Sequence, residues 1–165
     1  MKKYQIIYAD PPYIGQAKKH YNSEEVDHRE LILDLEAYDG WALSCSSPSL
    51  KVLIPMVNEI TLNYRIGIWI KPFCSFKPNV NPAYAWEPVI FKPARARGRD
   101  MMTVRDWVSA NITLKKGLSG VKPDAFSFWL FEILGANTND DFIDMFPGSG
   151  AVSMAWDKWK TGETK

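Results

Sequence analysis

One short stretch, Asp10-Pro11-Pro12-Tyr13, has the residue types and spacing of a ligand-binding or catalytic loop. It follows an apolar run around Ile6, which is typical of a buried strand. Proline fixes its own φ angle and disfavours the α region for the residue before it, so we expect Asp10 to be extended. The loop would present a carboxylate, a rigid carbonyl and an aromatic ring at the carboxyl end of a strand, where open α/β sheets bind ligands. The alternative is a proline-rich turn in which Tyr13 only contributes packing.

A second motif, Phe146-x-Gly148-x-Gly150, lies between an expected strand over 142–146 and an expected helix over 151–159. Glycine residues allow a backbone to approach a ligand closely, and the N-terminus of a helix favours a negatively charged group. By itself the motif is equally typical of a tight turn between a strand and a helix.

The elements that must position these motifs alternate between strands and helices. After the first strand, apolar and β-branched patterns predict strands over 41–45, 64–70, 84–91 and 142–146. Helices are expected from an N-cap at Ser23, after a cap at 46–48, and over 125–134, and residues 105–108 are expected to form a short helical turn. Pro88 predicts a bulge or an edge position for its strand. The pattern predicts a single α/β domain over 1–165 with about five strands.

The charge balance excludes a uniformly basic nucleic-acid-binding protein, because 20 Lys and Arg face 19 Asp and Glu. Any basic surface must therefore be local. The concentrated positive residues are Arg95, Arg97 and Arg99, followed by Lys115 and Lys116. Each group is either a solvated loop or a contact with nucleic-acid phosphates.

The two cysteines, Cys45 and Cys74, are isolated and lack the spacing of metal ligands, so no metal site is expected. They fit buried residues in a reducing cytoplasm. The start of the chain does not have the pattern of a signal peptide, and no apolar run is long enough to span a bilayer. We therefore expect a cytoplasmic protein that does not enter a membrane.

Taken together, the two motifs resemble those of the β group of DNA amino-methyltransferases, which methylate N6 of adenine or N4 of cytosine. In that group the chain is circularly permuted, with the catalytic motif first and the glycine loop (here 146–150) last. Gly120-Val121-Lys122-Pro123 and the segment from Trp86 to Lys92 also match, so the resemblance covers nearly the whole chain. It implies a Rossmann-like methyltransferase fold, a mostly parallel sheet with helices on both faces, and S-adenosylmethionine (SAM) as cofactor.

The resemblance also implies a role for each matching residue. Asp10 and the carbonyl of Pro11 would accept hydrogen bonds from the target amino group, with Pro12 completing the motif. The target base, flipped out of its duplex, would stack on Tyr13 and contact Tyr84 or Trp86. The implied cofactor-binding residues are Asp10, Lys122, Pro123, Asp144, Phe146, Gly148, Ser149 and Gly150. Asp144 would lie near the amino group of the cofactor, and Lys122 would face its carboxylate.

The chain departs from the family at two places. In the family, a strand with an acidic, ribose-binding residue follows the glycine-loop helix, whereas here few residues follow Trp159. The segment that corresponds to target recognition, 92–120, is also short, which predicts low sequence selectivity or dependence on a partner. If the sheet order follows the family, the strand over 142–146 is an apolar edge, so we expect a homodimer or a partner subunit to cover it.

The function that follows from the resemblance is SAM-dependent methylation of DNA at N6 of adenine, because an initial Asp is the adenine-leaning form of the catalytic motif. The small size fits a compact phage or bacterial enzyme. Three alternatives stay open: an RNA adenine methyltransferase, a DNA N4-cytosine methyltransferase, and a non-catalytic subunit that keeps the fold and needs a partner.

Overall fold

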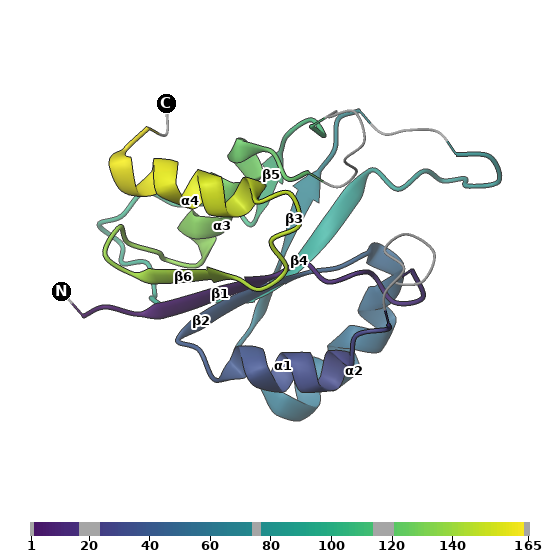
Figure 1. The fold of residues 1–165 in the computed structure, drawn as a ribbon, viewed down its shortest axis with the longest axis horizontal. Helices are drawn as coiled ribbons and strands as arrows, with labels where there is room; N and C mark the ends of the chain where they lie inside the picture. Colours follow the sequence, from purple (N-terminus) through teal and green to yellow (C-terminus); the bar gives the residue numbers. More distant parts are fainter. Residues whose placement is uncertain (1, 17–23, 74–76, 114–120, 164–165) are drawn as a thin grey trace.

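A six-stranded sheet forms the centre of the computed structural model, which describes residues 2–16, 24–73, 77–113 and 121–163 (Figure 1). The strand order is β5-β3-β4-β2-β1-β6. The strands are β1 (Gln5–Ala9), β2 (Gly40–Ser44), β3 (Arg65–Ile70), β4 (Trp86–Lys92), β5 (Trp107–Ser109) and β6 (Asp141–Asp144). Strand β4 is antiparallel to both of its neighbours, and the other three pairings are parallel. The sheet is therefore mostly parallel, as the sequence predicts.

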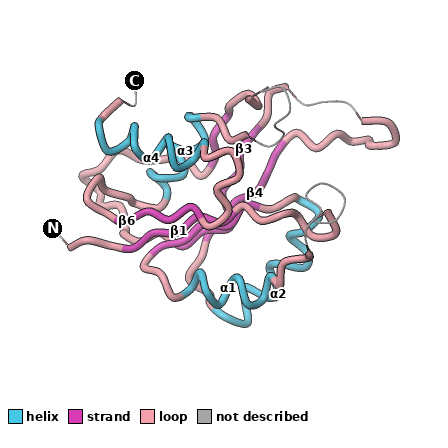
Figure 2. The backbone as a smooth tube through the Cα atoms, viewed as in Figure 1, coloured by secondary structure: helices cyan, strands magenta, loops and turns pink. Residues whose placement is uncertain are grey.

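Helices cover both faces of this sheet (Figure 2). They are α1 (His28–Glu36), α2 (Leu50–Ile60), α3 (Asp124–Ile133) and α4 (Ala151–Thr161), and a 3₁₀ turn, η2 (Ser47–Ser49), precedes α2. Helices α1 and α2 pack on one face and α3 and α4 on the other, which divides the core into two apolar clusters. None of the described helices is long and apolar enough to cross a membrane.

Strand β1 is buried on both faces, which explains why its sequence is apolar without alternation. Ile6 and Tyr8 point into the cluster under α3 and α4, whereas Ile7 and Ala9 point into the cluster under α1 and α2. Because its side chains are fixed on both sides, β1 holds the loop that follows it in a defined place. Asp10 is the first residue of that loop.

Two sequence predictions about helices are wrong. Asp27, not Ser23, caps α1: its side chain accepts hydrogen bonds from the amides of Arg29 and Glu30, and Ser23 lies outside the described residues. The segment 105–108 is not a helical turn, because Trp107 begins β5, which pairs with β3. This pairing raises the strand count from about five to six.

The prediction that Pro88 marks a bulge or an edge strand is also wrong, since β4 lies between β3 and β2 and its register with both strands is unbroken. The carbonyl of Pro88 accepts a hydrogen bond from the amide of Cys45, the residue directly after β2. Because proline has no amide hydrogen, it cannot donate the second hydrogen bond of this pair to the carbonyl of Cys45. A central strand tolerates proline here because the lost bond falls at the end of its pairing with β2.

Candidate active site

The catalytic motif and the glycine motif meet at one edge of the sheet. Asp10 follows β1 directly, and β6, which pairs with β1 in parallel, ends at Asp144. Tyr8 is the register partner of Asp144, and its carbonyl accepts a hydrogen bond from the amide of Met145. The carboxyl ends of the two neighbouring strands therefore bring Asp10 and Asp144, which lie far apart in the sequence, into one site.

Asp10 belongs to a buried network of four charges. The Nζ atom of Lys122 lies 3.1 Å from Oδ2 of Asp10 and also contacts Oε1 of Glu87. The second oxygen of Glu87, Oε2, lies 2.7 Å from Nζ of Lys71. Glu87 on β4 is 5% exposed and Lys122, before α3, is 6% exposed. The two carboxylates and two ammonium groups balance, which makes their burial tolerable.

The network sets the ionisation of its members. Burial opposes the charged form of Glu87, but Lys122 and Lys71 more than offset this effect and lower its pKa to about 2. Burial likewise opposes the charge on Lys122, yet the Asp10 and Glu87 carboxylates hold its pKa well above the ordinary value. The pKa of Asp10 is raised, because burial and the negative charge of Glu87 outweigh the opposing effect of Lys122.

The glycine loop, 146–150, begins just after Asp144 and opens α4. Gly148 and Gly150 have φ angles of 48° and 73°, a region that favours glycine, so the loop carries no side chain at either position. No side chain caps the N-terminus of α4. Backbone amides at such an end are free to bind an oxygen atom of a ligand.

Asp144 has one buried carboxylate oxygen without a hydrogen-bond partner in the described residues. Its Oδ2 atom accepts a hydrogen bond from Oγ of Ser153 at 3.3 Å, whereas Oδ1 is buried and has no hydrogen-bond partner in the described part of the chain. Burial raises the pKa of this carboxyl group. A buried acceptor without a partner is costly, and a ligand that donates a hydrogen bond would remove that cost.

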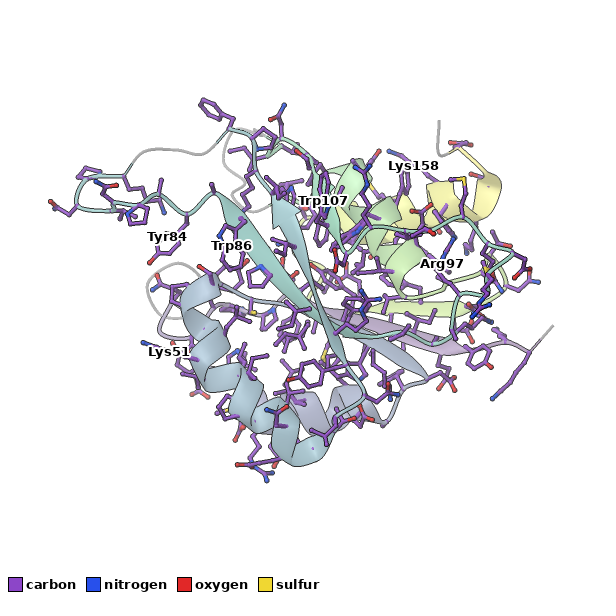
Figure 3. The ribbon with its side chains drawn as sticks, turned by 180° about the vertical axis from the view of Figure 1, so that it is seen from behind. Lys51, Tyr84, Trp86, Arg97, Trp107 and Lys158 are labelled. Carbon is purple, nitrogen blue, oxygen red and sulfur yellow. The ribbon has the colours of Figure 1, made fainter. Side chains whose placement is uncertain are left out.

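A pocket of about 670 Å³ lies on the other side of the catalytic motif. Its lining includes Tyr13, Tyr84, Trp86 and Glu87, so the structure brings together the three aromatic residues predicted to contact a base. Tyr84 and Trp86 are 59% and 41% exposed, and Figure 3 shows them on the same side of the molecule as Lys51. Two aromatic rings with accessible faces fit the stacking of a planar ligand.

The basic segment 95–99 lies at the opposite end of the sheet from this pocket. It follows β4, which spans about 20 Å from Trp86 to Lys92. Arg95 serves the fold, because its guanidinium bonds the carboxylate of Asp140 and the carbonyls of Gly135 and Lys2. Its guanidinium is therefore engaged within the fold, and its contact with a nucleic-acid backbone stays a prediction.

The other basic residues that were predicted to contact nucleic acid lie away from the pocket or outside the described residues. Arg97 is exposed and donates to the carbonyl of Met102; Figure 3 shows it on the far side of the molecule from Trp86. Arg99 is also exposed in this segment, and Lys115 and Lys116 lie outside the described residues. The lysines that line the pocket are Lys51 and Lys77, which sequence reasoning missed because each stands alone among uncharged residues.

The remaining predicted residues have structural positions that bear on their roles. Pro11 is buried, Pro12 and Phe146 are half-buried, and Pro123 is the N-cap residue of α3. Ser149 is exposed in the glycine loop. Lys122 binds two carboxylates, which differs from its predicted contact with the carboxylate of a cofactor. In the described residues, no group of three or more His, Cys, Asp or Glu side chains could hold a metal ion.

Comparison with known proteins identifies the fold. No profile of a protein family matches the chain, and no curated protein matches it. Among solved structures, the complex of M1.HpyAVI with SAM superposes with a TM-score of 0.60 at 18% identity, covering 96% of this chain and 79% of that one. A second structure of M1.HpyAVI gives a TM-score of 0.60 at 17% identity, covering 96% and 78%. The chain has this Rossmann-like α/β fold.

Proposed function

We propose that this protein is a SAM-dependent methyltransferase that acts on the exocyclic amino group of a base in DNA, N6 of adenine. The observation that carries the proposal is the position of Asp10 between two groups of residues that fit different ligands. On one side are Asp144 and the glycine loop, and on the other is the pocket lined by Tyr13 and Glu87. The fold shared with M1.HpyAVI, whose structure contains SAM, supports the assignment.

The residues on the β6 side fit SAM. Its ammonium group would donate to Oδ1 of Asp144, the buried acceptor without a partner. Gly148 and Gly150 have positive φ angles that favour glycine, and glycine has no side chain to obstruct the cofactor where it would pass. When bound, SAM supplies a methyl group on a positively charged sulfur. Because Asp10 lies next to Asp144, its carboxylate would face the methyl donor from β1.

The residues on the pocket side fit a base. Asp10 and the carbonyl of Pro11 would accept hydrogen bonds from the amino group and orient its nitrogen lone pair. The ring would stack on Tyr13 and contact Tyr84 or Trp86, and it must leave a duplex to reach them. An adenine target rests on the initial Asp of the motif. The catalytic motif precedes the glycine loop in the chain, which supports the circularly permuted arrangement.

A homodimer or partner subunit at β6 stays a prediction. In the described part of the chain β6 pairs only with β1, so its outer edge is open, and Ile143 is 39% exposed there. Such edges are usually covered. A dimer mass in light scattering at micromolar concentration, lost when Ile143 is replaced by Lys, is the expected result, and a monomer at that concentration would contradict the prediction.

The proposed function is tested by the transfer of a labelled methyl group from SAM to unmethylated duplex DNA. We expect label on N6 of adenine, and loss of transfer in Asp10→Asn with the fold retained. Asp157→Asn, which removes an exposed carboxylate on α4, is the matched control and should keep full activity. Parallel assays with single-stranded DNA, RNA and cytosine-only DNA separate the alternative substrates. A folded protein that binds SAM and methylates none of them would refute the proposal.

A further inference from the structure

The network around Lys122 has a feature that its charge balance does not explain. Lys122 contacts one oxygen of each carboxylate, Oδ2 of Asp10 and Oε1 of Glu87, and Lys71 holds the other oxygen of Glu87. In the described residues, Oδ1 of Asp10 has no such partner. The side chain of Asp10 is 24% exposed, so this oxygen can face a ligand. The network therefore leaves one particular oxygen of Asp10 available.

We propose that Lys122 is a positioning residue for the methyl transfer: it holds Oδ2 of Asp10 so that Oδ1 points at the amino group of the target base. Glu87 holds Lys122 in turn, and Lys71 holds Glu87. This inference rests on the proposed function, and it assigns Lys122 to the catalytic carboxylate in place of the cofactor carboxylate.

The surroundings of Lys122 restrict where its ammonium can lie. The Nζ atom sits 5.4 Å from the ring centre of Trp69 and 5.5 Å from that of Phe126, in addition to its two carboxylate contacts. Trp69 and Phe126 are both buried. Two anions and two aromatic rings fix the cation on several sides, and a fixed cation can orient a carboxylate.

Stability alone gives little reason for such an arrangement. Replacing a buried, balanced set of charges by apolar side chains of similar size is often neutral or stabilising. Orientation of a reacting group, by contrast, has a large effect on rate, since a misplacement of 1 Å can cost on the order of 100-fold. The network is therefore better explained by the position of Asp10 than by the stability of the fold.

The network also affects the pH at which Asp10 is ionised. The titratable groups that act on it are Tyr8 and Tyr13 near the motif, Glu87 from β4, Lys122 before α3 and Asp144 from β6. Of the groups that carry a charge at neutral pH, Lys122 is the cation and the others are anions. Without Lys122 the pKa of Asp10 rises further. As the pH is lowered, the rate of methyl transfer should therefore begin to fall at a higher pH than in the wild type.

The test compares Lys122→Met, the charge-balanced double variant E87Q/K122M and Lys158→Met. Lys158 forms an exposed ion pair with Asp124, so its variant is the matched control. For Lys122→Met we expect kcat to fall on the order of 100-fold, an unchanged dissociation constant for SAM by calorimetry, and an acid limb of the kcat profile at higher pH. In the double variant, which removes one charge of each sign, the pH profile should return toward the wild type while kcat stays low.

Three results would overturn the inference. Weaker SAM binding with kcat retained would assign Lys122 to the cofactor, and an equal loss of activity at every pH would indicate a structural role. If Lys122→Met does not fold, the double variant decides: a wild-type kcat there would exclude positioning. Failure of the proposed function is distinct, because the wild type itself would then transfer no methyl group.

Discussion

The replacement of Asp144 by Asn should stabilise the free protein and weaken its binding of SAM, two effects of opposite sign. The carboxylate accepts hydrogen bonds from the hydroxyl of Ser153 and the backbone amide of Phe146, and its Oδ1 atom is buried without a partner in the described residues. Burial raises its pKa, so the ionised form is disfavoured in the folded state. The stability that the protonated group contributes at low pH is lost as the pH rises through this raised pKa. At neutral pH, a neutral amide of the same shape removes that penalty.

The size of each effect follows from the contacts of Asp144. An unpaired buried polar group costs about 1–3 kcal/mol and a charged one costs more. Because the amide also leaves one buried polar atom unpaired, the substitution removes only the excess cost of the charge, at a site that is partly exposed. We therefore expect the free energy of unfolding to increase by about 1 kcal/mol, which raises Tm by about 2–4 °C in a chain of this size. A hydrogen bond to a charged group contributes about 1.5–3 kcal/mol, so its loss should increase the Kd for SAM on the order of 30-fold.

Thermal unfolding with and without SAM measures both effects together. At a SAM concentration of about 100 times the wild-type Kd, the ligand stabilises the wild type by about 2.7 kcal/mol and the variant by about 0.9 kcal/mol. The shift in Tm caused by SAM should therefore fall from about 5–11 °C to about 2–4 °C. Asp141→Asn, which removes an exposed carboxylate from the same strand, should change neither value. A variant that is less stable than the wild type and binds SAM normally would show that Asp144 supports the fold, and would refute the reasoning.

Three further predictions concern the pocket and the sheet. Trp86→Ala should raise the KM for DNA on the order of 10-fold, because stacking on one base contributes about 1–3 kcal/mol, with little change in thermal stability since Trp86 is 41% exposed. Lys51→Ala should weaken DNA binding and reduce the slope of log K against log salt by about 1, whereas Arg97→Ala should leave that slope unchanged in fluorescence anisotropy. Gly40→Ala should lower the free energy of unfolding in urea by about 1–3 kcal/mol, because its Cβ would lie 2.5 Å from the backbone nitrogen of Ala94, and an unchanged midpoint would contradict this.

The alternation of apolar strands and helices was sufficient to predict the α/β class, because that feature depends on local pattern and on general rules of sheet construction. The two covered faces and the edge position of β6, which the structure has, were predicted from the family resemblance of the motifs. The same rules bring Asp10 and Asp144 together, since the carboxyl ends of parallel neighbouring strands lie at one edge. The ordering of the motifs along the chain was therefore informative about the site.

Sequence reasoning misses features that a distant partner decides. Arg95 stands in a basic segment, and nothing in that segment indicates that Asp140, 45 positions later, binds its guanidinium. Residues 105–108 have the local features of a turn, and pairing with β3 makes Trp107 the start of a strand. Local composition carries no information on such partners, so propensity is overridden by tertiary pairing.

The charges of the site explain why the two sides of Asp10 should take different ligands. The carboxylates of Asp10 and Glu87 are balanced by Lys71 and Lys122, so this part of the site is close to neutral. Asp144, which pairs with none of these cations, is left as a net negative charge beside the glycine loop. A positively charged ligand such as SAM is therefore favoured on the β6 side. The pocket has the opposite character, because lysines lie at its wall together with aromatic rings, and it favours a planar ligand that carries phosphate. Asp10, between the two, is the group that both ligands would share.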